Sequence, residues 1–111
     1  MGRGDYLGEL EQIVMLAVAR LEGEAYGMNI RREIEQRGGR SVAIGAVYAT
    51  LERLEDKGFV RTTARERAPE ADGRARRFFE LTASGIGALE AATEVHSRMR
   101  AGLRLRRAGR S

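Results

Sequence analysis

Arginine is the residue type in this sequence best suited to binding a ligand, and its distribution along the chain is uneven. Nineteen of the 20 basic residues are arginine, and Lys57 is the exception. Residues 1–60 carry a net charge of −2, whereas residues 61–111 carry +6. A planar guanidinium matches phosphate groups and guanine edges. A GC-rich genome would also favour arginine over lysine, so the position of the arginines is the stronger indication of nucleic-acid binding.

The densest arginine cluster lies in residues 61–77, where the net charge is +3. Its basic members are Arg61, Arg65, Arg67, Arg74, Arg76 and Arg77. Gly73 permits a tight turn and a close approach to a backbone, and Arg74 beside it is placed to enter a minor groove. Arg76 and Arg77 point to opposite faces of an extended strand, so one of them is expected to face DNA. The alternative is a solvated basic loop.

A second candidate surface is the helix predicted at residues 44–57. Its apolar face consists of Val47, Tyr48, Leu51 and Leu54. The opposite face consists of Ala46, Ala49, Thr50 and Arg53. Small side chains allow a helix to lie close in a major groove, where Thr50 could bond a base or phosphate and Arg53 a guanine. The alternative for the two alanines is that they are simply good helix formers.

Hydrophobic spacing and turn residues predict the elements that position these side chains. Helices are expected at 6–21, with Asp5 as the N-cap, at 26–37 and at 44–57, and a last helix follows Thr82 as its cap. Strands at 59–67 and 76–82 flank a turn containing "DG". Three helices followed by a hairpin predict a mainly α fold with a small β-hairpin, the winged helix-turn-helix. Tyr26 and Tyr48 are further candidate DNA contacts.

The last helix predicts a homodimer, because its apolar stripe is too long for so small a domain to cover. The stripe consists of Ile86, Leu89, Thr93, His96, Met99 and Leu103, and Leu7 and Leu10 of the first helix are expected to join it. Residues 1–81 therefore form the predicted DNA-binding domain, and residues 82–111 form a dimerisation helix with a basic tail that is disordered or contacts DNA. A two-fold axis would place two reader helices roughly 34–36 Å apart, on an inverted repeat.

Composition excludes most other functions. The absence of cysteine excludes disulfides and thiolate catalysis, and a single histidine leaves little for a metal site. We find no catalytic triad or phosphate-binding glycine loop, and the carboxylates are expected on solvent faces, so no enzyme, cofactor or metal is predicted. No long apolar run or leader is seen, so we expect a cytoplasmic protein with no membrane contact.

Three blocks of sequence resemble a known family. They are "LGELEQIVMLAVARLEGEAYGMNIRREIE", "GAVYATLERLEDKGFV" and "GRARRFFELTASG", which together resemble the N-terminal domain of the PadR family of bacterial transcriptional regulators. The resemblance implies a winged-helix homodimer that binds double-stranded DNA, usually as a repressor, in the short subclass with a single C-terminal helix. The family pattern maps onto Ala43, Gly45, Val47 and Tyr48, and onto Gly73, Arg74, Arg76 and Arg77 in the wing.

The sequence departs from the family pattern at two positions, and one family property does not transfer. Ala43 cannot cap a helix as serine does, so Ser41 is expected to supply the cap or a phosphate contact. Ala75 replaces a frequent proline in the wing. Many relatives respond to small aromatic or drug-like compounds, but capture between tryptophans cannot apply to a chain without tryptophan. An effector pocket is instead expected between the last and first helices, lined by Leu10, Val14, Leu89 and Met99.

A protein-interaction module is the alternative to a DNA-binding regulator. Winged helices do host such roles, and a basic wing could bind an acidic protein. DNA binding should weaken steeply with salt, so a salt titration separates the two hypotheses.

Overall fold

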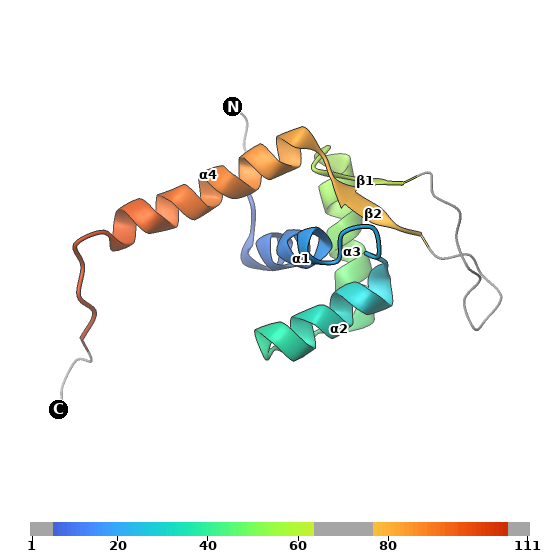
Figure 1. Ribbon diagram of the computed structural model, residues 1–111, viewed down its shortest axis with the longest axis horizontal. Helices are drawn as coiled ribbons and strands as arrows, with labels where there is room; N and C mark the ends of the chain where they lie inside the picture. Colours follow the sequence, from blue (N-terminus) through green and yellow to red (C-terminus); the bar gives the residue numbers. More distant parts are fainter. Residues whose placement is uncertain (1–5, 64–76, 107–111) are drawn as a thin grey trace.

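The computed structural model describes residues 6–63 and 77–106 of the chain, which form four helices and two short strands (Figure 1). The elements are α1 (Glu9–Arg20), α2 (Gly27–Gly38), α3 (Ile44–Asp56), β1 (Val60–Thr62), β2 (Phe79–Leu81) and α4 (Ala83–Arg100). The predicted order of three helices, a hairpin and a last helix is confirmed. No helix within the described ranges is long and apolar enough to span a membrane.

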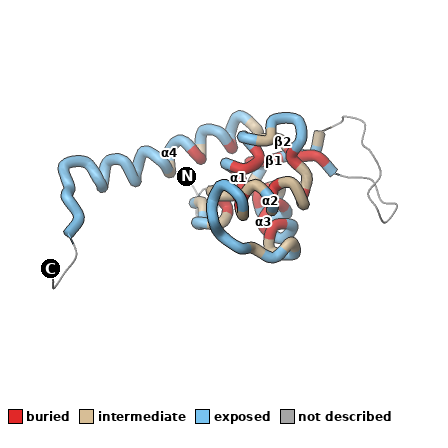
Figure 2. Tube along the Cα trace, turned by 60° about the horizontal axis from the view of Figure 1, so that its bottom comes forward, coloured by how far each residue is buried: buried red, intermediate tan, exposed pale blue. Residues whose placement is uncertain are grey.

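The core lies where α1, α2 and α3 pack together beneath the small sheet (Figure 2). Its most deeply buried apolar side chains include Val14, Met15, Ile30, Val47, Leu51, Leu54, Val60 and Phe79. Burying one large apolar side chain contributes about 1.5–3 kcal/mol, so this cluster is the main stabilising feature of the domain. Its members recur every three or four residues in each helix, which is why the sequence forms these amphipathic elements.

The two strands form an antiparallel pair in which Arg61 lies opposite Glu80. The backbone N–H of Phe79 also donates to the carbonyl oxygen of Ala25 at 2.8 Å. This bond ties β2 to the turn between α1 and α2 and fixes the sheet on the helical core. Residues 64–76, which include Gly73, Arg74 and Arg76 of the predicted wing, lie outside the described residues.

α4 begins at a tightly bonded joint with the sheet. The Thr82 hydroxyl donates to the carbonyl oxygen of Gly58 at 2.6 Å and accepts from the N–H of Gly85 at 3.0 Å. The predicted Thr82 cap is thus confirmed. A Cβ on Gly85 would collide with the carbonyl oxygen of Phe59, so only glycine allows α4 to approach the sheet this closely.

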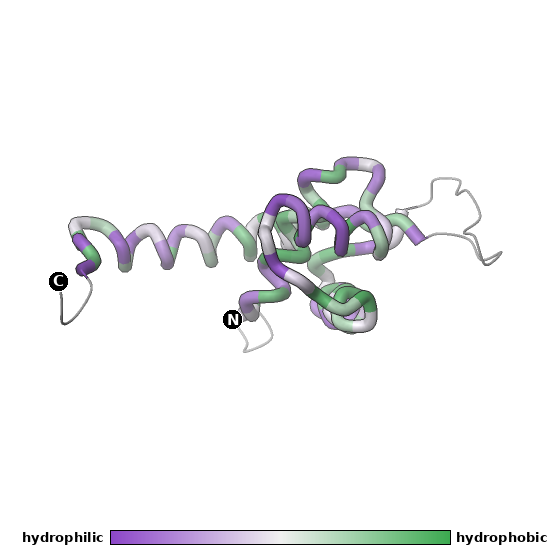
Figure 3. Tube along the Cα trace, turned by 90° about the horizontal axis from the view of Figure 1, so that it is seen from below, coloured by the Kyte–Doolittle hydropathy of each residue, from purple (hydrophilic) through white to green (hydrophobic). Residues whose placement is uncertain are grey.

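Beyond this joint, α4 extends away from the helical core (Figure 1). No side chain between residues 90 and 106 is buried, and polar and apolar residues alternate along this length (Figure 3). At the other end of the chain α1 begins later than predicted. Its N-cap is Gly8 rather than Asp5, because the Gly8 N–H donates to the side chain of Glu11 at 2.7 Å.

Candidate nucleic-acid interface

The exposed side of α3 is one continuous face. It consists of Gly45, Tyr48, Ala49, Glu52, Arg53 and Asp56, which follow one another at alternating spacings of three and one. Such spacing places all six on the same side of a helix. α3 is the second helix of the α2–turn–α3 unit, the position from which a helix-turn-helix protein reads the major groove. We call these six residues the reader face.

The predicted reader face is rotated about the helix axis relative to the observed one, as the position of Thr50 shows. Its side chain is fully buried, and its hydroxyl donates to the carbonyl oxygen of Ala46 at 2.7 Å. The expectation that Thr50 contacts DNA is therefore wrong. Ala46 is half-buried, whereas Ala49 and Arg53 are exposed as predicted.

Tyr48 occupies the place on the reader face that was predicted for Thr50. It was expected in the apolar stripe, but 42% of the residue is exposed. Its ring lies against Gly27, the first residue of α2, where a Cβ would collide with the phenol carbon and hydroxyl oxygen. Tyr26 precedes Gly27 and packs edge-on against Phe78, with ring centroids 5.5 Å apart. The ring of Tyr48, which belongs to α3, and the residue Tyr26 therefore both lie at the start of α2.

α3 begins without a side-chain cap. Its N-cap residue, Ala43, has extended backbone angles and makes no side-chain hydrogen bond. Of the two roles expected for Ser41, the helix cap is therefore wrong, whereas the phosphate contact stays a prediction for this exposed residue. Uncapped N–H groups at a helix start, together with the positive end of the helix dipole, favour binding of phosphate.

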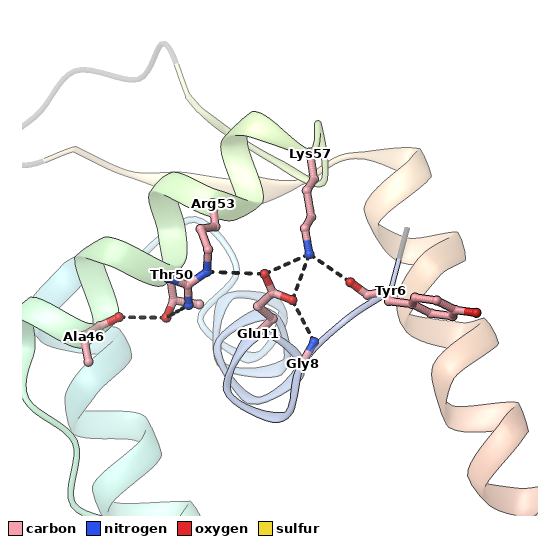
Figure 4. Close-up of polar contacts among 7 residues, drawn as sticks. All are labelled: Tyr6, Gly8, Glu11, Ala46, Thr50, Arg53 and Lys57. Carbon is pink, nitrogen blue, oxygen red and sulfur yellow. Dashed lines mark hydrogen bonds and ion pairs between the residues drawn. The ribbon is translucent and has the colours of Figure 1, made fainter. Parts of the chain in front are cut away.

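Arg53 belongs to a polar network that joins α3 to α1 (Figure 4). Its Nε lies 3.6 Å from Glu11 Oε2, and its Nη2 donates to the Thr50 hydroxyl at 3.2 Å. Lys57 Nζ donates to both Glu11 oxygens at 3.0 Å and to the carbonyl oxygen of Tyr6 at 2.8 Å. A single carboxylate on α1 thus pairs with Arg53 of α3 and with Lys57, the residue that follows the helix.

Glu11 is held as a carboxylate although it is buried, with 5% of the residue exposed. Burial raises its pKa more than any other single influence. The hydrogen bonds from Gly8 and Lys57, with the charges of Lys57 and Arg53, together outweigh burial and lower the pKa below its ordinary value of 4.5. The expectation that all carboxylates lie on solvent faces is wrong for Glu11. Its position in the series Leu7, Glu11, Val14, Val18, on the apolar side of α1, was the available signal.

The described end of the wing carries arginines that are already paired. Arg77 Nη2 lies 3.2 Å from a carboxylate oxygen of Glu55, and its guanidinium lies over the Phe79 ring at 5.1 Å from the centroid. Arg61 pairs with Glu80 at 2.6 Å. These two arginines are paired with Glu80 and Glu55 at the base of the hairpin, so part of their positive charge is already neutralised within the protein.

The stripe predicted for the dimer interface divides into two parts. Leu89 is largely buried in the core of its own chain, so it has little surface left for a second copy. Leu7 and Leu10 are half-buried against the same core. Ile86, Thr93, His96, Met99 and Leu103 are exposed. The sequence reasoning missed three further exposed apolar residues, Leu16, Val95 and Leu105.

A hollow does lie between α1 and α4, but only Leu89 of its predicted lining borders it. Val14 is fully buried, and Met99 is exposed on the projecting part of α4. The residues that line the hollow are Leu16, Leu89, Glu90, Thr93, Glu94 and Ser97. A separate groove of about 290 Å³ lies between α1 and α2, with Ile13, Leu16 and Ile34 among its lining residues.

Comparison with known proteins agrees with this geometry. Residues 15–91, more than half of the chain, match the family described as "Transcriptional regulator PadR-like family". No curated protein sequence matches the chain.

The chain is also similar to solved structures. One is a PadR-like transcription factor from Bacteroides fragilis, at 24% identity and a TM-score of 0.65, with 82% of each chain covered. Another is smu.1704 from Streptococcus mutans, at 27% identity and a TM-score of 0.60, covering 86% of this chain and 85% of that one. A third is hsRosR-S1, solved as a complex, at 27% identity and a TM-score of 0.63, covering 90% and 82%. The chain therefore belongs to the PadR-like family of transcriptional regulators.

Proposed function

We propose that this regulator is a homodimeric repressor that binds an inverted-repeat operator through α3 and the wing. The observation that carries the proposal is the reader face, an exposed helix face whose centre is occupied by Ala49. A small residue at the centre lets the helix enter the groove. Tyr48 and Arg53, on either side of Ala49 along the helix, are long enough to reach base edges or phosphates.

Other proposed contacts surround the reader face. The uncapped start of α3, with the exposed Ser41 and Gly45, would receive a phosphate. Gly73, Arg74 and Arg76 in the wing would contact the adjacent minor groove. Thr50 is not part of this proposal, because it is buried.

The proposed dimer forms through the projecting half of α4. Val95 and Met99 lie four residues apart there, Leu103 follows just beyond the end of the helix, and each is more than half exposed. A second copy related by a two-fold axis would cover this apolar surface. The same axis would set the two reader faces roughly one turn of DNA apart, which is why we propose an inverted repeat.

DNA binding is tested by exchanging single arginines. The probe is a duplex selected by the wild-type protein from a randomised library. Arg53→Ala should lose about 1–3 kcal/mol of binding free energy, as expected for a base contact. Arg98→Ala is the matched control, because Arg98 is also an exposed, ion-paired arginine but lies on α4. Equal affinities for the two variants would contradict the assignment of α3, and a binding constant insensitive to salt would favour the acidic-partner alternative.

The dimer is tested by placing charges on the exposed part of α4. Val95→Asp combined with Met99→Asp should give a monomer in light scattering, with weak binding to the selected duplex. Val95→Ile combined with Met99→Leu keeps the surface apolar and should remain dimeric. A dimeric aspartate variant would place the interface elsewhere.

Release from DNA by a small aromatic or drug-like effector completes the proposal. The groove between α1 and α2 is the site that we assign to it, because its apolar lining suits a planar ring. Planar phenolics and planar cations would be screened by thermal shift. A compound that stabilises the wild type but not Ile13→Phe, which narrows the groove, supports the assignment. An equal shift in both proteins contradicts it.

A further inference from the structure

Arg53 is the longest side chain on the reader face, and an arginine in that position needs a defined direction to read a base. A freely rotating guanidinium is attracted to any phosphate, whereas bidentate contact with guanine requires a fixed plane. The side chain of Arg53 is 55% exposed, so packing alone does not hold it. Its direction must therefore come from its polar partners.

The Thr50 hydroxyl supplies one of these partners. Its proton is committed to the carbonyl oxygen of Ala46 at 2.7 Å, which leaves its lone pairs as the groups that face Arg53. Arg53 Nη2 donates to this oxygen at 3.2 Å. Because Thr50 is fully buried, its hydroxyl cannot turn away to bond water instead.

The Glu11 carboxylate supplies the other partner. Oε2 lies 3.6 Å from Arg53 Nε, while the Gly8 N–H and Lys57 Nζ hold the carboxylate in place. Lys57 alone would neutralise Glu11, since its ammonium contacts both oxygens. Glu11 therefore does not need Arg53 to balance its charge.

We infer that Glu11 and Thr50 are positioning residues that fix the Arg53 guanidinium in the direction needed to read DNA. They act through Arg53, whose side chain both of them contact in Figure 4, and they are not themselves proposed to touch DNA. The two contacts use the Nε side and Nη2, and the Nη1 amino group is used in neither. This inference rests on the proposed function, in which Arg53 faces DNA.

The quantity that reports positioning is the ratio of affinities for the selected duplex and for an unrelated duplex of equal length. Glu11→Gln and Thr50→Val keep the charge of Arg53, so affinity for the unrelated duplex should persist. Affinity for the selected duplex should fall about three- to tenfold, part of what one bidentate base contact contributes to discrimination. A merely structural role would reduce the folded fraction and lower both affinities together.

Matched variants separate positioning from folding. Thr50→Ser keeps the hydroxyl but loses a buried methyl group, so it should lower stability and keep the ratio. Lys57→Met leaves both partners of Arg53 in place but removes one group that holds Glu11, so it should lower stability and reduce the ratio by less than Thr50→Val does. If Glu11→Gln does not fold, the comparison of Thr50→Val with Thr50→Ser decides the question by itself.

The outcomes distinguish failure of the inference from failure of the proposed function. A ratio unchanged by Arg53→Ala would show that Arg53 does not read DNA, and both would fail. A ratio lowered by Arg53→Ala, but kept by Glu11→Gln and Thr50→Val, would overturn the positioning role alone. A ratio lowered equally by Thr50→Ser and Thr50→Val would also overturn it.

Discussion

Replacing Gly85 with alanine tests how the sheet and α4 are joined. The new Cβ would collide with the carbonyl oxygen of Phe59 and lie 2.9 Å from its carbonyl carbon. That oxygen also accepts the N–H of Thr82 at 3.0 Å. Because the obstacle is backbone, α4 can relieve the collision only by moving away from the sheet. The movement would strain the bonds that Thr82 makes with Gly58 and Gly85.

The magnitude follows from three contributions. Forcing an extra methyl group into a packed site costs about 1–3 kcal/mol. Loss of a threonine N-cap costs about 1 kcal/mol, and the better helix propensity of alanine returns about the same amount. The free energy of unfolding should therefore fall by about 1–3 kcal/mol, which lowers Tm by roughly 5–20 °C in a domain of this size.

Urea and thermal unfolding followed by circular dichroism, at one fixed protein concentration, would measure the effect. Gly87→Ala is the matched control on the same helix, because a Cβ there meets nothing within 4 Å. It should raise the free energy of unfolding by about 0.5–1 kcal/mol. If Gly85→Ala proves as stable as Gly87→Ala, the close approach of α4 to the sheet is not what stabilises this joint.

Three further predictions concern other parts of the domain. Because the pKa of Glu11 is lowered on folding, its stabilising effect is present above pH 4.5 and is lost as the pH falls below that value. Below pH 4.5, the free energy of unfolding should therefore fall less steeply with pH in Glu11→Gln than in the wild type. Ala43→Ser should raise the free energy of unfolding by about 1 kcal/mol in urea unfolding. An unchanged urea midpoint would show that the N–H groups at the start of α3 gain nothing from a side-chain cap. Arg77→Ala should cost less than about 1 kcal/mol of stability, because its pair with Glu55 is exposed; a larger thermal shift would contradict that.

The order and type of the elements could be predicted from the sequence, but the rotation of α3 could not. The sets Val47, Tyr48, Leu51, Leu54 and Val47, Thr50, Leu51, Leu54 both fit one helix face. Hydrophobicity favours the tyrosine. Thr50 is buried because its hydroxyl bonds the preceding turn, and Tyr48 is exposed because Gly27 leaves room for its ring. Both reasons depend on three-dimensional contacts that the spacing of apolar residues along the sequence does not reveal.

Similar ambiguity affected α4 and the buried carboxylate. An apolar position such as Leu89 has the same pattern whether it packs on its own chain or on a second copy. Glu11 lies on the apolar side of α1, but its partner Lys57 is 46 residues away in sequence. Pairing between such distant residues follows from the packing of α1 against α3, which single-sequence periodicity does not reveal.

The connection between β2 and α4 is a single residue, Thr82, whose hydroxyl is hydrogen-bonded to both Gly58 and Gly85. The 18 residues of α4 are about 27 Å long, so a change of about 10° at this connection would move the far end by about 5 Å. The helix acts as a lever arm whose angle is set by Gly58, Thr82 and Gly85. In the proposed dimer, substitutions at these three positions would therefore alter the preferred half-site separation while leaving the base sequence of each half-site unchanged.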